Sequence, residues 1–137
     1  MADAALIVCS FHTPDEYYTR HAERLRGDLE RLGLEHDIRE IAKSDDQDWA
    51  DVCRQKVAFL AEVCAAHPDS RVLWIDVDCS LHALPAWLAG FTADLIGFQR
   101  GFGSPLTIGY GQRTRFWEPC LFGIGATRQG RAFIEDA

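Results

Sequence analysis

Two short apolar runs, residues 5–11 and 71–75, carry the strongest structural signal in this sequence. Each has the length of one strand and almost no polar residues, which is typical of strands covered on both faces in a parallel sheet. The segments between and after them show the three- and four-residue spacing of apolar residues that indicates amphipathic helices. This alternation predicts an α/β fold, with a mostly parallel sheet and helices on both faces in three layers.

The first helix is expected to begin within residues 13–16, where threonine, proline, aspartate and glutamate follow one another. We interpret Thr13 as the N-cap, Pro14 as the first helical residue and Glu16 as the glutamate of a capping box. The apolar stripe that follows ends at Gly33, and glycine is the residue most typical of a helix C-terminus. These residues complete one strand–helix unit.

A second helix is expected from the acidic stretch 44–48, which supplies an N-cap and favourable charge for the helix dipole, to about Ala66. We expect its apolar face to include Trp49, Val52, Cys53, Leu60 and Val63. Lys56 is the one charged residue on that face. A lysine that faces the sheet calls for an anion, although its stem can equally pack while the ammonium reaches water.

The remaining predicted elements are an edge strand at 34–41, a helical turn at 85–88, strands at 93–98 and 120–124, and a helix capped by Thr127. Residues 99–115, in contrast, show little periodicity and contain four glycines. We predict a loop there that covers a site, because a loop of this length is usually functional or mobile. The three arginines of this segment are candidates for holding a diphosphate: Arg100, Arg113 and Arg115. Of these, Arg100 is the predicted donor-binding residue.

The composition limits the function and the location. A chain of 137 residues, 47% of them hydrophobic, fits a single domain that spans residues 1–137. The net charge of −7 argues against nucleic acids and anionic membranes as partners, since both require a basic surface. The five cysteines form no Cys-x-x-Cys pair, and no apolar run approaches the length of a membrane span. We therefore expect a cytoplasmic protein with reduced thiols.

Two carboxylates, Asp76 and Asp78, follow the second apolar run directly. Because side chains alternate along an extended segment, we expect both to point the same way, at the sheet edge where ligands of such folds bind. A divalent cation would relieve their repulsion, and oxygen ligands favour Mg²⁺ or Mn²⁺. The alternative is that one aspartate caps a turn while the other is solvated.

Segments 6–14 and 72–78, with a helix that carries Cys53 and Lys56, resemble the nucleotide-diphospho-sugar transferase family, which has the GT-A fold. The resemblance implies a glycosyltransferase that moves a sugar from a nucleotide-diphosphate sugar to an acceptor that the sequence does not identify. It also implies that the Asp-x-Asp pair holds Mn²⁺ or Mg²⁺ on the diphosphate of the donor.

The same resemblance assigns roles to single residues. The end of the first strand, with Ser10, His12 and Thr13, would face the nucleotide, and Lys56 would lie at the donor site. Asp78 would be both a metal ligand and a catalytic residue. Apart from the resemblance, an inverting transfer needs a base for the acceptor hydroxyl; either Glu118, the candidate catalytic residue, or Asp94 could serve, since the sequence does not choose between them. A retaining course would need no such base.

Enzymes of this family usually continue past the point where this chain ends. We therefore expect a fragment that lacks the usual C-terminal part, or a reduced domain completed by a partner or by homo-oligomerisation. Two other functions stay open. One is a non-catalytic module that binds a nucleotide sugar. The other is a phosphatase of the haloacid-dehalogenase type, because residues 75–81 resemble its nucleophile loop, in which Asp76 would attack phosphorus.

Overall fold

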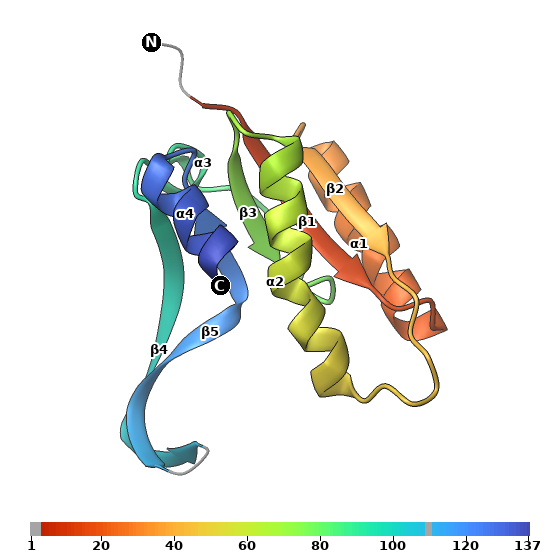
Figure 1. Ribbon diagram of the computed structural model, residues 1–137, viewed down its shortest axis with the longest axis vertical. Coiled ribbons are helices and arrows are strands. Elements are labelled where there is room, and N and C mark those ends of the chain that lie inside the picture. The colour runs from red at the N-terminus through yellow and green to blue at the C-terminus, as the bar shows by residue number, and fades with distance from the viewer. Residues whose placement is uncertain (1–3, 109–110) are drawn as a thin grey trace.

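The computed structural model describes residues 4–108 and 111–137, the side chains of 102–108 and 111–114 excepted (Figure 1). Nine elements follow one another within these ranges: β1 (Leu6–His12), α1 (Glu16–Arg31), β2 (Glu35–Glu40), α2 (Trp49–Ala66), β3 (Arg71–Ile75), α3 (Ala86–Ala89), β4 (Leu95–Ile108), β5 (Gly111–Ile124) and α4 (Arg128–Asp136). None of these helices is both long and apolar enough to cross a membrane.

One mixed sheet of five strands, in the order β2-β1-β3-β5-β4, organises the chain. β1 pairs in parallel with both β2 and β3, whereas β5 runs antiparallel to β3 and to β4. The α/β class is confirmed, and the sheet is mixed rather than mostly parallel. Because β1 and β3 are parallel, their carboxyl ends lie at the same edge of the sheet.

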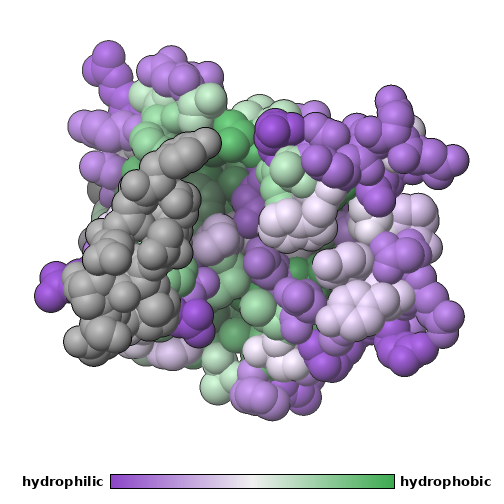
Figure 2. Space-filling view, turned by 90° about the horizontal axis from the view of Figure 1, so that it is seen from below, coloured by the Kyte–Doolittle hydropathy of each residue, from purple (hydrophilic) through white to green (hydrophobic). Residues whose placement is uncertain are grey.

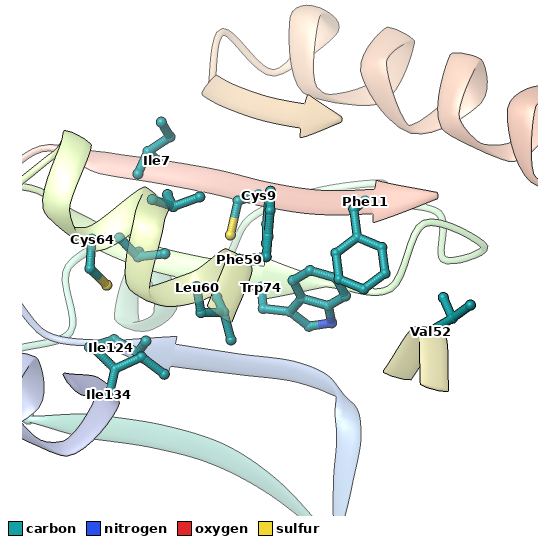
Figure 3. Close-up of a cluster of buried hydrophobic side chains, with 12 residues drawn as sticks. Ile7, Cys9, Phe11, Val52, Phe59, Leu60, Cys64, Trp74, Ile124 and Ile134 are labelled. Carbon is teal, nitrogen blue, oxygen red and sulfur yellow. The ribbon is translucent and has the colours of Figure 1, made fainter. Parts of the chain in front are cut away.

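Helices cover both faces of the sheet (Figure 1). Alternate residues of β1 point to opposite sides, so Ile7, Cys9 and Phe11 pack against α2 and α4, whereas Val8 packs against α1 and α3. The α2 side contains a cluster of three rings, Phe11, Phe59 and Trp74, in edge-to-face contact (Figure 3). This cluster ends at the carboxyl edge of β1 and β3.

The helix caps differ in part from the prediction. The N-cap of α1 is Asp15, whose carboxylate accepts from the Tyr18 backbone N–H, so the capping box at Thr13 is wrong. A carboxylate is the better acceptor for a helix N-terminus, and the Thr13 hydroxyl donates to Asp15 instead. Gly33 ends the helix with φ +66°, as predicted. α2 begins after Asp48, which forms a capping box with Asp51.

The predicted loop at 99–115 is wrong, because β4 and β5 form a long antiparallel hairpin there. The hairpin leaves the sheet at a register shift after Gly97 and projects beyond the carboxyl edge of β3 (Figure 1). Its strands are held by backbone pairing and have exposed side chains such as Phe98 and Trp117, so no apolar alternation marks them in the sequence. The other predicted strands, the turn of α3 and the Thr127 cap are confirmed.

Candidate functional site

A cleft of about 480 Å³ opens at the carboxyl ends of β1 and β3. Its walls come from the end of β1, the start of α1, the first turns of α2, the residues after β3, and Pro119 of β5. Figure 2 views the molecule from this side; apolar and hydrophilic side chains are mixed around its centre, and most of the rim is hydrophilic. Ligands of open α/β sheets bind at this edge, so the cleft is the candidate site.

Asp76 lies in the cleft with a cation beside it. Its Oδ1 accepts from the Lys56 Nζ at 3.2 Å and from the Trp74 Nε1 at 2.6 Å. The Lys56 ammonium also donates to the Pro119 carbonyl at 3.0 Å and lies 4.4 Å from the centre of the Trp74 ring. Lys56 therefore faces the sheet, and Asp76 is its anionic partner.

Asp78 lies on a turn. The Cys79 N–H donates to the Asp76 carbonyl at 2.9 Å, so the chain after β3 folds back instead of continuing as a strand. The prediction that residues 76–78 are extended is therefore wrong, although the carboxylates of Asp76 and Asp78 both line the cleft. Asp78 is exposed, and its backbone carbonyl accepts from the Arg24 Nη2 of α1 at 3.1 Å.

The end of β1 brings two of its three predicted donor residues to the cleft. His12 and Thr13 line it, and the His12 Nδ1 lies 2.8 Å from the Thr13 carbonyl oxygen. The Thr13 hydroxyl donates to Asp15 at 2.5 Å and lowers the pKa of that carboxyl. Ser10 is fully buried, outside the cleft lining, and its hydroxyl has no hydrogen-bond partner among the described residues. Its role in donor binding stays a prediction.

Arg100 and Glu118 lie on the hairpin, outside the lining of the cleft. They form an ion pair with each other at 3.0 Å. Asp94, the other acid considered as a base, accepts from the Thr127 hydroxyl at the start of α4. The Arg113 side chain lies outside the described residues. The roles assigned to Arg100 and Glu118 stay predictions.

Sequence reasoning missed Tyr18, Lys43 and Trp49 as residues of the cleft. Trp49 was expected on the buried face of α2, yet 70% of it is exposed. It is the first residue of the helix and lines the open cleft, so helical spacing alone could not place it. Lys43 follows β2 in a polar connection that carries no motif.

The site suits a divalent cation only in part. Within residues 4–108 and 111–137, no group of three or more His, Cys, Asp or Glu side chains is placed to hold a metal ion. Three carboxylates line the cleft, but both oxygens of Asp15 already accept hydrogen bonds, which leaves Asp76 and Asp78 as the candidate ligands. One oxygen of Asp76 accepts two hydrogen bonds. Mg²⁺ is commonly held by one or two carboxylates with substrate phosphates and water, and this donor set fits that arrangement.

Comparisons with known proteins concern the fold alone. No protein-family model matches the sequence, and neither does any curated protein. A solved structure of a glycosyltransferase involved in the glycosylation of the major capsid of PBCV-1 is similar, with a TM-score of 0.62 and 11% sequence identity. The similarity covers 96% of this chain and 64% of that one. This chain thus spans less than two thirds of the length of that structure.

Proposed function

We propose that this chain binds a nucleotide-diphosphate sugar in the cleft and serves in a metal-dependent glycosyltransferase of GT-A type. The observation that carries the proposal is the meeting of Asp76, Asp78 and Lys56 at the carboxyl ends of β1 and β3. The similar fold of a glycosyltransferase supports it. The acceptor and the sugar are left open by this argument.

The cleft has parts that suit the parts of such a donor. Two ammonium groups, Lys43 and Lys56, would offset the negative charge of a diphosphate. Aromatic and aliphatic residues such as Phe11 and Val52 would exclude water from the nucleoside. Asp78 and the free oxygen of Asp76 would hold Mn²⁺ or Mg²⁺, which stabilises negative charge on the leaving diphosphate.

In the transfer, the bond from the anomeric carbon to the diphosphate oxygen breaks, and a bond from that carbon to the acceptor oxygen forms. The acceptor hydroxyl loses its proton. Glu118 is proposed as the base, and its carboxylate forms an ion pair with Arg100 on the hairpin. Arg100 would have to exchange this partner to reach a phosphate.

Calorimetric titration of UDP, GDP and their sugar conjugates tests the proposal. Each ligand is titrated in the presence of Mn²⁺ and again with EDTA. Asp76→Asn and Asp78→Asn remove the carboxylates without a change of size. Asp69→Asn is the matched control, because this exposed aspartate lies in the turn before β3, at the opposite end of that strand from the cleft.

The proposal expects one nucleotide to bind in the presence of Mn²⁺. Binding should be at least tenfold weaker with EDTA or in either cleft variant, which corresponds to about 1.4 kcal/mol. Binding should be unchanged in Asp69→Asn. Binding without transfer of the sugar to water or to any acceptor would indicate the non-catalytic module. Absence of binding in every condition would contradict the donor site.

A further inference from the structure

We infer that Lys56 is a built-in counter-ion of Asp76. The lysine keeps the affinity of the cleft for a divalent cation low as long as no diphosphate is bound, so that the cation binds together with the diphosphate. This inference rests on the proposed function, since it concerns the same cleft. It adds an order of binding and assigns that order to one side chain.

Three contacts hold the Lys56 ammonium in place. It donates to Oδ1 of Asp76 at 3.2 Å and to the carbonyl of Pro119 at 3.0 Å, and it lies over the ring of Trp74 at 4.4 Å. The lysine side chain is 21% exposed and that of Asp76 33%, so the pair is only partly screened by water. The carboxylate is therefore already paired with a cation of the chain itself.

A divalent cation bound to Asp76 would stand beside this ammonium. Two cationic groups within a few ångströms repel each other, and the repulsion is stronger in a partly buried cleft than in water. The hydrogen bonds that Lys56 and Trp74 donate to Oδ1 also draw negative charge away from the other carboxylate oxygen, to which the cation would bind. Both effects weaken the binding of a free cation.

A diphosphate changes this balance. It brings several negative charges, so the ammonium can exchange Asp76 for a phosphate oxygen and keep a partner of opposite charge. Asp76 is then free to bind the cation, which has phosphate oxygens as further ligands. The affinities for cation and diphosphate are coupled, and the coupling must be reciprocal.

The cleft contains a matched control for Lys56. Lys43 lines the same cleft, but its ammonium has no hydrogen-bond or ion-pair partner among the described residues. Lys43→Met removes one positive charge from the cleft and leaves Asp76 and its partners in place. Lys56→Met also removes one positive charge, but this charge is the direct partner of Asp76. Lys56→Arg keeps a cation at that position.

The experiment measures the binding of Mn²⁺ alone, from the loss of the electron paramagnetic resonance signal of the free ion. Lys56→Met should bind Mn²⁺ about tenfold more tightly than the wild type, and Lys43→Met and Lys56→Arg should stay within about threefold of it. Lys56→Gln serves as a second neutral variant, and circular dichroism establishes that each variant is folded. Addition of UDP should then increase Mn²⁺ affinity more in the wild type than in Lys56→Met.

Equal Mn²⁺ affinity in the wild type and in both neutral Lys56 variants would overturn the inference. An equal gain in Lys43→Met would also overturn it, because the effect would then come from the overall charge of the cleft. If Mn²⁺ alone binds more tightly to Lys56→Met but neither UDP nor GDP binds to the wild type or to any variant, the counter-ion role stands and the proposed function fails. The two ideas therefore fail in different ways.

Discussion

The parallel half of the sheet and the β4–β5 hairpin stabilise their strands by different means. β1 and β3 lie between helices, and their apolar residues are buried on both faces. Beyond Gly97 the hairpin has exposed side chains on residues 98–101 and relies on pairing between its own strands. One region is held by burial and the other by backbone hydrogen bonds.

This difference separates the two tasks of the molecule. The parallel half stabilises the fold through the buried apolar residues of β1 and β3. It also forms the rim of the cleft, because His12 and Asp76 lie at the carboxyl ends of these strands. The hairpin contributes Pro119 to the cleft and extends from it. Substitutions in the two regions should therefore differ in their effect on stability.

The largest effect is expected in the buried half. Leu73→Ala in β3 removes a fully buried side chain and should lower the free energy of unfolding by about 2–5 kcal/mol. Phe98→Ala in the hairpin truncates a side chain that is 56% exposed and should cost less than about 1 kcal/mol. Urea unfolding followed by circular dichroism measures both, and equal losses would break the comparison.

A smaller loss is expected where the hairpin joins the rest of the chain. A Cβ on Gly125 would clash with the backbone oxygen of Ala93, so Gly125→Ala should destabilise the fold by about 1–3 kcal/mol. Gly27 in α1 has nothing within 4 Å of such an atom. Gly27→Ala should therefore stabilise by about 0.5–1 kcal/mol, and thermal unfolding shows whether the signs are opposite.

The ion pair of the hairpin should matter still less for stability. Arg100 is exposed, with 57% of its side chain accessible, so Arg100→Met should cost less than about 1 kcal/mol in urea unfolding. In a Glu118→Gln background, Arg100→Met should cost less than it does in the wild type, because the ion pair is already absent before the arginine is replaced. A loss as large as that of Leu73→Ala would show that the hairpin stabilises the fold through this pair.

The last effect concerns pH and is absent at neutral pH. Burial raises the pKa of the Cys79 thiol, near the end of β3, from 9.0 to about 11. In the unfolded chain this thiol ionises near pH 9, so its contribution to stability is present below pH 9 and decreases as pH rises to about 11. Alkylation of Cys79 by iodoacetamide should increase over the same range, and full reactivity at pH 8 would contradict the burial.

The sequence predicted the parallel half well because burial leaves a hydropathy pattern. Strands covered on both faces have to be apolar, and helices that cover them have to be amphipathic. The apolar runs 5–11 and 71–75 were therefore predicted as strands, which the structure has as Leu6–His12 and Arg71–Ile75, and Lys56 was predicted to face the sheet. The predicted partner of this lysine was an anion, and the structure gives Asp76.

The hairpin and the turn after β3 could not be predicted in the same way. Backbone pairing between two exposed strands needs no apolar side chains, so residues 99–108 resembled a loop. The fold-back at Asp78 depends on a hydrogen bond between Asp76 and Cys79, and α1 supports it through Arg24. These contacts join residues far apart in the sequence or depend on backbone angles.

The four tryptophans offer the most direct test of the central claim, that a nucleotide diphosphate binds at the carboxyl ends of β1 and β3. Trp49 and Trp74 line the cleft, whereas Trp87 lies on α3 and Trp117 on the hairpin, both outside it. Their indole N–H signals in a ¹⁵N-correlated NMR spectrum can be assigned with single Trp→Phe variants. Titration with UDP or GDP and Mg²⁺ should shift the signals of Trp49 and Trp74 and leave the other two unchanged. Shifts confined to Trp87 or Trp117, or no shift with either nucleotide, would contradict the account.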